Sequence, residues 1–494
     1  MEAKFEQLQA RLRELAPQLT VRSFDPDERT IVVVHSLSLD VPRRLLQVMP
    51  AYEERFLCLV LSIVRQPATH VVYLTSQPIL PRLVDYWLRL VPRVDREEIR
   101  SRLSVLSVGD STPRPLTEKI LEHPRLIERI RQRIVAPERS VLLPFNVSPL
   151  ECELAVRLGI PVYGPSPEHA WIGTKSGSRR IFEEEGVEHP AGVEDVSSLG
   201  DVVSAIEEIQ RRRPAARQVI VKLNDGVSGL GNGLIALGAR AAQSARGVAL
   251  EDPQLSSEEF YEHLARQGGI VEEVIEGEGF CSPSAQLRAL PDGTVEVLST
   301  HDQILGGPHG QTYLGCRLPA DPAYATAIGR EARRVGERLA REGVIGRFAV
   351  DFVAVRDGDD WRAYAVEINL RNGGTSHPVF TLQALTDGEY EEATGRFLAG
   401  SGQEKYYLAT DDLESPAYRS LTPDDALDIA EAEGIGWDDD RQIGVALHMV
   451  SAIAIAGRIG LTAIGDTPAE ADALYRNVKS VFDAETRPEA VGLS

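Results

Sequence analysis

Short apolar runs alternate with amphipathic, charged stretches over the first third of the chain. β-Branched runs at 31–35, 70–75, 141–145 and 161–164 have the length and composition of buried strands. Their alternation with helical stretches is typical of a parallel sheet with crossover helices, so we predict a Rossmann-like α/β domain over residues 1–164. No GxGxxG motif follows the first strand, which argues against a dinucleotide site there.

The pattern changes after Gly164, where strands no longer alternate regularly with helices. Strand-like runs lie at 218–224, 233–237, 269–275, 284–290 and 294–305, and helical periodicity lies at 175–185, 199–212 and 324–341. This mixture predicts an α+β unit with largely antiparallel sheets over residues 165–404. A polar stretch at 401–405 precedes a small third domain, which we place at 405–494.

The totals narrow the class of protein. Lys and Arg number 53 against 74 Asp and Glu, a formal net charge of −21, which disfavours nucleic acid and anionic membranes as partners. The first twenty residues are charged and lack the apolar core of an export signal, and no apolar run reaches the roughly 18 residues of a membrane span. We therefore expect a cytoplasmic protein whose four cysteines, far apart and without metal-ligand spacing, stay reduced.

A lysine and a run of glycines stand between two predicted strands. In VIVKLNDGVSGLGNGLIAL, Lys222 ends one strand, and Gly226, Gly229 and Gly231 lie in the turn before the next. Glycine lets backbone amides approach phosphate oxygens closely, and the lysine adds a mobile positive charge. A plain flexible hairpin explains the glycines equally well, and no GK[ST] closes the stretch as in a Walker A loop.

The strongest signal is a pair of strand-like runs, RFAVDFVAV and RAYAVEINLRN, joined by a DGDD turn. Asp351 and Glu367 are each eight residues from Asp359, so the simplest register places the two acids opposite each other. Carboxylates that face each other across a hairpin repel unless a cation lies between them, and with Asn369 they offer the oxygen ligands that Mg²⁺ prefers. Arg371 continues the same face and suits a transferring phosphoryl group. The alternative, a solvated edge hairpin, is disfavoured by the alternating apolar residues on both sides.

The order of these pieces over residues 164–399 resembles that of the ATP-grasp superfamily. Lys175 near a helix start comes first, then Lys222 before the glycine-rich hairpin, then the acidic strand end GGIVEEVIEGEGF, and last the D…ExNxR pattern. With EINLRNGGTSHP and the small C-terminal domain, the whole layout is most similar to the pheganomycin-type peptide ligases. The resemblance implies a preATP-grasp domain followed by an ATP-grasp domain, whose nucleotide lid spans 173–270 and whose catalytic core spans 271–400.

The resemblance also implies roles for individual residues. Contacts with ATP are implied for Lys175, Lys222, Gly226, Ser228, Gly229, Gly231, Glu272, Glu273 and Ile275, with backbone at 272–275 reading the adenine. Asp351, Glu367 and Asn369 would hold Mg²⁺, and Arg371 would be the catalytic residue. Two ions are expected, with Mn²⁺ as an alternative. Relatives usually place an acid where Gly279 stands, so Glu278 or Glu276 is expected to take the ribose.

Two further segments are candidates for substrate contacts. One is the glycine-bearing segment at 299–319, which could line a substrate pocket, although an ordinary polar loop without that role is an equal alternative. The other is NGGTSHP at 372–378, which we favour because it lies close to the expected acyl-phosphate. The predicted substrate-contacting residues of the two segments are Asp302, Gln311, Tyr313, Thr375, Ser376 and His377. A lone histidine is more often a packing residue, so His377 is not assigned as the general base.

The function implied by the resemblance is an ATP- and Mg²⁺-dependent ligase of natural-product peptide biosynthesis. It would activate a carboxylate as an acyl-phosphate and join it to an amine, releasing ADP and phosphate. The expected partners are small-molecule carboxylates and amines or peptides, with a homodimer left open. Two alternatives also stay open: an ATP-grasp enzyme that uses a thiol or carboxylates a small molecule, and a catalytically silent ATP-binding regulator. The complete acidic hairpin argues against the silent protein.

Overall fold

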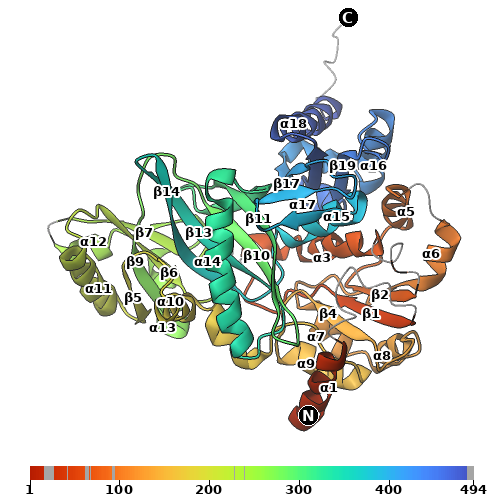
Figure 1. Cartoon of the computed structure of the whole chain (residues 1–494), viewed down its shortest axis with the longest axis horizontal. Helices are drawn as coiled ribbons and strands as arrows, with labels where there is room; N and C mark the ends of the chain where they lie inside the picture. Colours follow the sequence, from red (N-terminus) through yellow and green to blue (C-terminus); the bar gives the residue numbers. More distant parts are fainter. Residues whose placement is uncertain are drawn as a thin grey trace, which may run out of the picture.

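The chain forms an N-terminal parallel sheet, a separate antiparallel sheet (the lid, named after its predicted role) and a long sheet that runs through the centre of the molecule (Figure 1). The computed structural model describes residues 1–15, 27–41, 43–61, 66, 68–91, 95–226, 229–238 and 240–486. Within these ranges no helix is long and apolar enough to cross a membrane.

The N-terminal sheet has four parallel strands in the order β3-β2-β1-β4. Its strands are β1 (Arg29–Val34), β2 (Thr69–Thr75), β3 (Leu103–Ser107) and β4 (Val141–Pro144). Its helical segments are α1 (Glu2–Leu15), α2 (Arg43–Leu46), α3 (Met49–Tyr52), the 3-10 helix η2 (Glu53–Leu59), α5 (Pro81–Arg89), α6 (Arg96–Arg102), α7 (Leu116–Leu121), α8 (Pro124–Arg131) and α9 (Pro149–Leu158). The predicted parallel α/β sheet is confirmed, although residues 161–164 contribute only a bridge between Val162 and Leu142. The apolar pattern does not reveal β3, because serines interrupt its short run LSVLS.

The lid is a five-stranded antiparallel sheet in the order β5-β9-β6-β7-β8. Its strands are β5 (Gly192–Val196), β6 (Gln218–Leu223), β7 (Asn232–Ala236), β8 (Ala249–Leu250) and β9 (Gly269–Glu273). The helical segments here are η3 (Pro167–Gly173), α10 (Lys175–Glu184), α11 (Leu199–Arg212), α12 (Ala241–Ala245) and α13 (Ser257–Gln267). The lid has its own apolar core, in which Ile206, Val221 and Phe260 are fully buried. The glycine-rich turn therefore projects from an independently packed support.

The central sheet has nine strands in the order β14-β13-β10-β11-β12-β17-β20-β19-β18. Its strands are β10 (Pro283–Ala289), β11 (Val295–Gly306), β12 (Thr312–Leu318), β13 (Gly346–Asp357), β14 (Asp360–Asn369), β17 (Tyr406–Glu414), β18 (Trp437–Asp438), β19 (Ile443–His448) and β20 (Arg458–Gly465). The predicted strand at 294–305 is confirmed as β11, but the loop predicted after it is wrong in part, because Thr312–Leu318 form β12 and pair with β11. Since β12 also pairs with β17, a strand more than ninety residues later in the sequence (406 − 312 = 94), its strand state depends on a distant partner.

The remaining elements cover the central sheet or extend it. They are α14 (Pro322–Arg341), α15 (Ser376–Thr386), β15 (Glu389–Glu391), β16 (Arg396–Leu398), η4 (Pro416–Ser420), α16 (Pro423–Ala432), α17 (Ala452–Ala456) and α18 (Pro468–Glu485). Strands from the predicted third domain thus continue the sheet that carries the acidic hairpin. Lys405, in the predicted linker, is buried and donates to the backbone carbonyls of Arg441 and Gln442.

The N-terminal region and the C-terminal strands share one hydrophobic core. Phe56, Leu57 and Trp87 pack in the same buried cluster as Leu461 and Phe482. A hydrogen bond joins the same two regions, because the backbone N–H of Leu447 donates to the Tyr86 hydroxyl at 2.8 Å. The two ends of the chain are therefore held together by a continuous apolar interior.

Candidate active site

The register of the acidic hairpin, formed by β13 and β14, depends on a bulge. Its turn is tight, with Asp357 paired to Asp360 and Gly358 at φ +66°. A regular ladder from that turn would pair Asp351 with Val366 (357 + 360 − 351 = 366) and send Glu367 to the opposite face. A bulge beside Asp351 shifts the register by one residue, so that Asp351 pairs with Glu367. The predicted opposition of the two carboxylates is confirmed.

The paired carboxylates form a set of oxygen ligands. Asn369 Nδ2 donates to Asp351 Oδ2 at 2.9 Å, and Lys175 Nζ lies 2.7 Å from Glu367 Oε1. Burial, reinforced by the negative charge of Glu367, raises the pKa of Asp351 to about 6. Two acids forced together in this way fit a hard divalent cation, which would relieve their repulsion. The predicted metal ligands therefore suit Mg²⁺.

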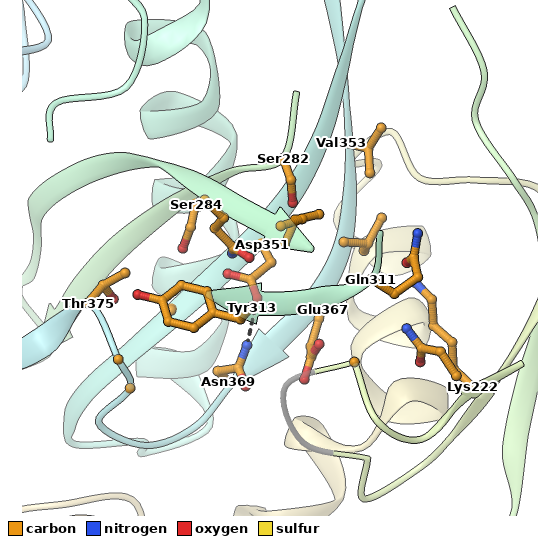
Figure 2. Close-up of a pocket in the computed structure, with 18 of the residues that line it drawn as sticks. Lys222, Ser282, Ser284, Gln311, Tyr313, Asp351, Val353, Glu367, Asn369 and Thr375 are labelled. Atoms are coloured by element: carbon orange, nitrogen blue, oxygen red, sulfur yellow. Dashed lines mark hydrogen bonds between the residues drawn. The ribbon is translucent and has the colours of Figure 1, made fainter. Parts of the chain in front are cut away.

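The hairpin forms one wall of a cleft beneath the lid (Figure 2). The predicted site residues that line this cleft are Lys222, Gly229, Gln311, Tyr313, Asp351, Glu367, Asn369, Arg371 and Thr375. Sequence reasoning missed Phe280, Ser282, Ser284, Gln303 and Val353, which line it as well. The sequence did offer a signal for Phe280, because an aromatic residue follows directly after the GEG turn, and in the structure this side chain is 48% exposed.

A buried acid connects the lid lysine to a helix. Glu272 is 1% exposed, and its carboxylate accepts hydrogen bonds from Lys222 Nζ and from Arg179 Nη1 of α10. The backbone N–H groups of Glu273 and Val274 already donate to carbonyls in the lid. The side chain of Glu272 and the amide of Glu273 therefore support the lid, while adenine contacts by the backbone at Glu272 and Glu273 stay predictions. Roles for Ile275 and Glu278 stay predictions.

The glycine-rich turn depends on close backbone approach. A Cβ on Gly231 would lie 2.9 Å from the Cα of Gly226, so these two glycines pack face to face. Gly229 has φ +78°, and a Cβ there would lie 2.0 Å from the carbonyl oxygen of Gln311. The tip of the turn thus touches the rim of the cleft, which no other residue could do without a shift. Ser228 lies outside the described residues.

Arg371 lines the cleft together with the lid lysine. Its guanidinium lies 5.8 Å from the ring centre of Phe145, and Nη1 donates to the carbonyl of Asn372 at 3.2 Å. Burial lowers its pKa, against the opposing charges of Glu367 and Asp351. Among the described residues Arg371 makes no ion pair within 4.0 Å. A positive charge held in this way can face the oxygens of a phosphoryl group.

Three of the predicted substrate residues lie elsewhere. Asp302 accepts hydrogen bonds from the Tyr324 hydroxyl at 2.7 Å and from the backbone of Asp321, so it fixes the start of α14. Ser376 Oγ accepts from the backbone N–H of Gly373 and thereby shapes the loop. His377 is 1% exposed and points into the interior. None of these three residues lines the cleft, so the structure does not bring them to the predicted substrate site.

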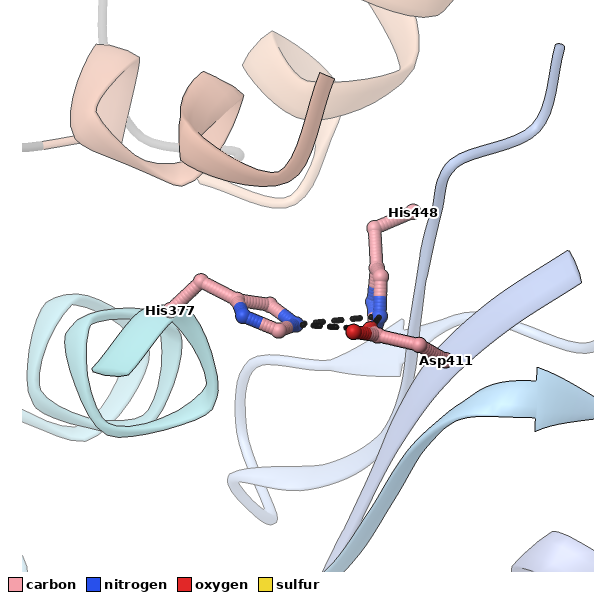
Figure 3. A group of neighbouring side chains, drawn as sticks. All are labelled: His377, Asp411 and His448. Atoms are coloured by element: carbon pink, nitrogen blue, oxygen red, sulfur yellow. Dashed lines mark hydrogen bonds and ion pairs between the residues drawn. The ribbon is translucent and has the colours of Figure 1, made fainter. Parts of the chain in front are cut away.

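His377 belongs to a buried triad with Asp411 and His448 (Figure 3). The two Nε2 atoms are 3.0 Å apart, and Asp411 Oδ1 lies 2.8 Å from His448 Nε2 and 3.4 Å from His377 Nε2. Burial, and then the neighbouring His448, lower the pKa of His377 to about 3, so its ring is neutral. Although burial opposes it, the Arg55 guanidinium holds the pKa of Asp411 well below its usual range. These three groups could ligate a metal, but Arg55 already neutralises the carboxylate at 2.9 Å.

Comparison with known proteins agrees with this geometry. Residues 250–390 match the family model described as IQCH-like, ATP-grasp, and residues 425–478 match the PGM1 C-terminal domain. The L-propargylglycine–L-glutamate ligase of Streptantibioticus cattleyicolor is 36% identical over 439 residues, covering 87% of this chain and 89% of the ligase.

Solved structures share the fold. Biotin carboxylase of Campylobacter jejuni superimposes with a TM-score of 0.55 at 15% identity, over 94% of this chain and 96% of that one. The ADP complex of N5-carboxyaminoimidazole ribonucleotide synthetase gives a TM-score of 0.52 at 12% identity, over 93% and 98%.

A nucleotide-type cleft under a glycine-rich lid, with paired carboxylates at its base, defines an ATP-grasp enzyme. The chain belongs to the ATP-grasp family. It is an ATP-dependent ligase that forms an amide bond, related over most of its length to a ligase that joins two amino acids. That relationship favours amide formation over a thiol acceptor, a carboxylation or a silent regulator.

Proposed function

We propose that this ligase activates the carboxylate of one amino acid as an acyl-phosphate and transfers it to the amine of a second amino acid. The observation that carries the proposal is the pairing of Asp351 with Glu367 inside a cleft that also presents Lys222 and Arg371. Paired acids, a lysine and an arginine around one space are the charges that phosphoryl transfer to a carboxylate requires.

The nucleotide would lie between the lid and the central sheet. Lys222 and the turn around Gly229 would face the phosphates, and the apolar side chains of Phe280 and Val353 offer surface for the adenine. In this arrangement residues 173–270 act as the lid, 271–400 as the catalytic core, and 1–164 and 405–494 as flanking domains.

Asp351, Glu367 and Asn369 are the residues that would hold Mg²⁺, and we expect two ions. When bound, Mg²⁺ supplies positive charge that neutralises the phosphate oxygens. Lys175 is the counter-charge of Glu367 in this structure and also donates to the Gly226 carbonyl at 3.1 Å. Lys175 thereby connects the acidic hairpin to the lid.

The chemistry has two steps. A carboxylate oxygen of the first substrate attacks the γ-phosphorus, a new O–P bond forms, the bond to the β–γ bridging oxygen breaks, and ADP leaves. The amine nitrogen of the second substrate then attacks the acyl carbon. The C–N bond forms, phosphate leaves with the electron pair of the broken C–O bond, and the amine proton passes to phosphate or water. Arg371 would face the developing negative oxygens, and the lid would exclude water from the acyl-phosphate.

The relative's printed name points to the substrate class. That enzyme joins L-propargylglycine, a small apolar amino acid, to L-glutamate. We propose that the present chain likewise joins two amino acids, or an amino acid and a short peptide, in the biosynthesis of a natural-product peptide. The polar lining of the cleft, with Ser282, Ser284 and Gln303, suits a polar carboxylate donor such as glutamate.

The test is ADP release with ATP and Mg²⁺ against amino acids offered singly and in pairs, with each product identified by mass spectrometry. We expect ADP and a dipeptide in equal amounts from one pair, and neither from Glu367→Gln. Formation of ADP with no requirement for an amine, or of a thioester or carboxylated product, would contradict the proposal.

A further inference from the structure

A second cavity adjoins the ATP cleft. The two share Tyr313, Arg371 and Gly374, so a molecule in one borders on a molecule in the other. One side of the second cavity is apolar, and the other side carries charge. The apolar side is formed by Leu37, Leu39, Val41, Leu45 and Phe145. An apolar wall beside charged groups is the lining expected for an amphiphilic small molecule.

The charged side has an excess of positive groups. Arg55 pairs with Asp411 at 2.9 Å and Arg458 with Asp412 at 2.9 Å, which leaves Arg371 without an acid within 4.0 Å among the described residues. Arg55 is 5% exposed, and its Nε–H has no hydrogen-bond acceptor in the described part of the chain. A buried guanidinium donor without an acceptor is costly, so this cavity favours an anionic ligand.

The buried triad keeps Arg55 in place. His448 Nε2 lies 2.8 Å from Asp411 Oδ1 (Figure 3). The other oxygen of Asp411 accepts from Arg55 Nη1. His35 Nε2 lies 3.2 Å from Arg55 Nη2 on the opposite side. The arginine is thus restrained by partners from both ends of the chain, as expected for a group that recognises a ligand rather than one that swings freely.

We propose that the second cavity binds the amine-bearing substrate as an α-amino acid with a small apolar side chain. This inference rests on the proposed ligase function. The α-carboxylate would pair with Arg55, the side chain would lie against the wall that includes Val41, and the amine would face the edge shared with the ATP cleft. Placed there, the amine nitrogen borders the space in which the acyl-phosphate forms.

Val41 offers a direct test, because it lines the cavity and belongs to no buried hydrophobic cluster. Val41→Phe should weaken binding of L-norvaline at least about tenfold, since an added ring fills the space of the side chain. Binding is measured by calorimetry with Mg²⁺ and a non-hydrolysable ATP analogue. Val41→Ala is the matched control and should keep L-norvaline binding within about twofold while improving L-leucine. Unchanged L-norvaline binding in Val41→Phe, or a loss of L-glutamate binding instead, would overturn the proposal.

Kinetics separate this inference from the proposed function. Hydroxylamine is small enough to reach the acyl-phosphate without the second cavity, so Val41→Phe should still form a hydroxamate while its KM for the apolar amino acid rises. Absence of hydroxamate from the wild type with every carboxylate would refute the ligase mechanism. L-Norvaline binding would still be judged by calorimetry.

Arg55→Lys tests recognition of the carboxylate while keeping the charge beside Asp411. The wild type should bind L-norvaline much more tightly than L-norvalinamide, and the variant should lose at least about tenfold of that preference because lysine lacks the planar fork of donors. Thermal unfolding within a few degrees of wild type shows that the fold is kept. A preference for the acid over the amide that is equal in both proteins would contradict the assignment.

Discussion

The ATP cleft and the second cavity touch each other, yet they are assembled in different ways. The cleft is built from three hairpins, β6–β7, β11–β12 and β13–β14, and their neighbours, all within residues 222–375. The second cavity collects residues from 37–55, from the loop after Asn369, and from strands β17 and β20. The cleft therefore follows from local sequence motifs, whereas the second cavity exists only once the two ends of the chain have packed together.

Their electrostatics differ as well. The cleft holds two carboxylates on facing positions of a hairpin, where Glu367 pairs with Lys175 but Asp351 has no basic partner within 4.0 Å among the described residues. In the second cavity the acids are already paired, Asp411 with Arg55 and Asp412 with Arg458. The difference suits a cation in the cleft and an anion in the second cavity.

The largest effect on activity is expected from the acidic hairpin of β13 and β14. Asp351→Asn should lower kcat by at least about 10²–10³-fold, since a preorganised charge at the reacting phosphate is lost. Asp360→Asn, an exposed acid at the turn of the same hairpin, should leave kcat within about twofold. Steady-state ADP release measures both. Equal losses of kcat in the two variants would show that the overall charge of the hairpin, and not the position of Asp351 in the cleft, determines activity.

The residue at the border of the two cavities should come next. Arg371→Lys keeps the charge but loses the planar donors, so kcat should fall by about 10²-fold at saturating substrates. Arg362→Lys, on an exposed ion pair of β14, provides the matched control. A rise in KM alone, with kcat retained, would assign Arg371 to ground-state binding and contradict its role in the reaction.

A substitution of Lys222 tests whether the lid contributes to ATP binding alone. Lys222→Met should raise the KM for ATP about tenfold and leave the KM for the amine substrate nearly unchanged, because one phosphate contact is lost. The fold should survive, since Glu272 keeps Arg179 as its partner at 3.0 Å. Lys479→Met, on an exposed helix position, serves as the control. An equal rise in both KM values would contradict the separation of the two cavities.

The smallest expected effect is on stability at the junction of the two chain ends. Burial raises the pKa of Glu54 to about 7, and its carboxylate accepts from the Ser451 backbone at 3.3 Å. The folded protein therefore binds this proton more tightly than the unfolded chain does, so stability falls as pH rises from about 4.5 to about 7 and then levels off. Glu54→Gln should remove about 1–3 kcal/mol of that decline in the free energy of unfolding.

Chemical denaturation at pH 5 and pH 8 measures the decline. The exposed Glu97→Gln serves as the control and should retain the pH slope of the wild type. A Glu54→Gln protein with the full wild-type slope would show that the carboxylate is not sequestered at the junction.

Much of the cleft could be predicted because the residues that line it lie in short, recognisable sequence motifs. The opposition of Asp351 and Glu367 follows from counting across one turn, although the tight turn and the bulge compensate each other in a way that the count does not reveal. The glycines of the lid turn are likewise a local signal, because positive φ and close approach leave little choice of residue.

The second cavity and the triad could not be predicted, since nothing local links Arg55 with Asp411 or His377 with His448. His377 follows the predicted metal ligands in sequence, which favours a substrate contact, but α15 starts there and turns the ring into the core. The strand state of β12 is equally hidden from local sequence, because its partner β17 lies far along the chain.

In the proposed reaction a carboxylate is activated as an acyl-phosphate and its acyl group is passed to an amine. The most direct measurement uses a carboxylate donor labelled with ¹⁸O in both oxygens, with ATP, Mg²⁺ and the amine partner, followed by mass spectrometry of the products. We expect one ¹⁸O in each inorganic phosphate, with ADP and dipeptide in equal amounts. Unlabelled phosphate, or AMP and pyrophosphate in place of ADP, would contradict the proposed reaction.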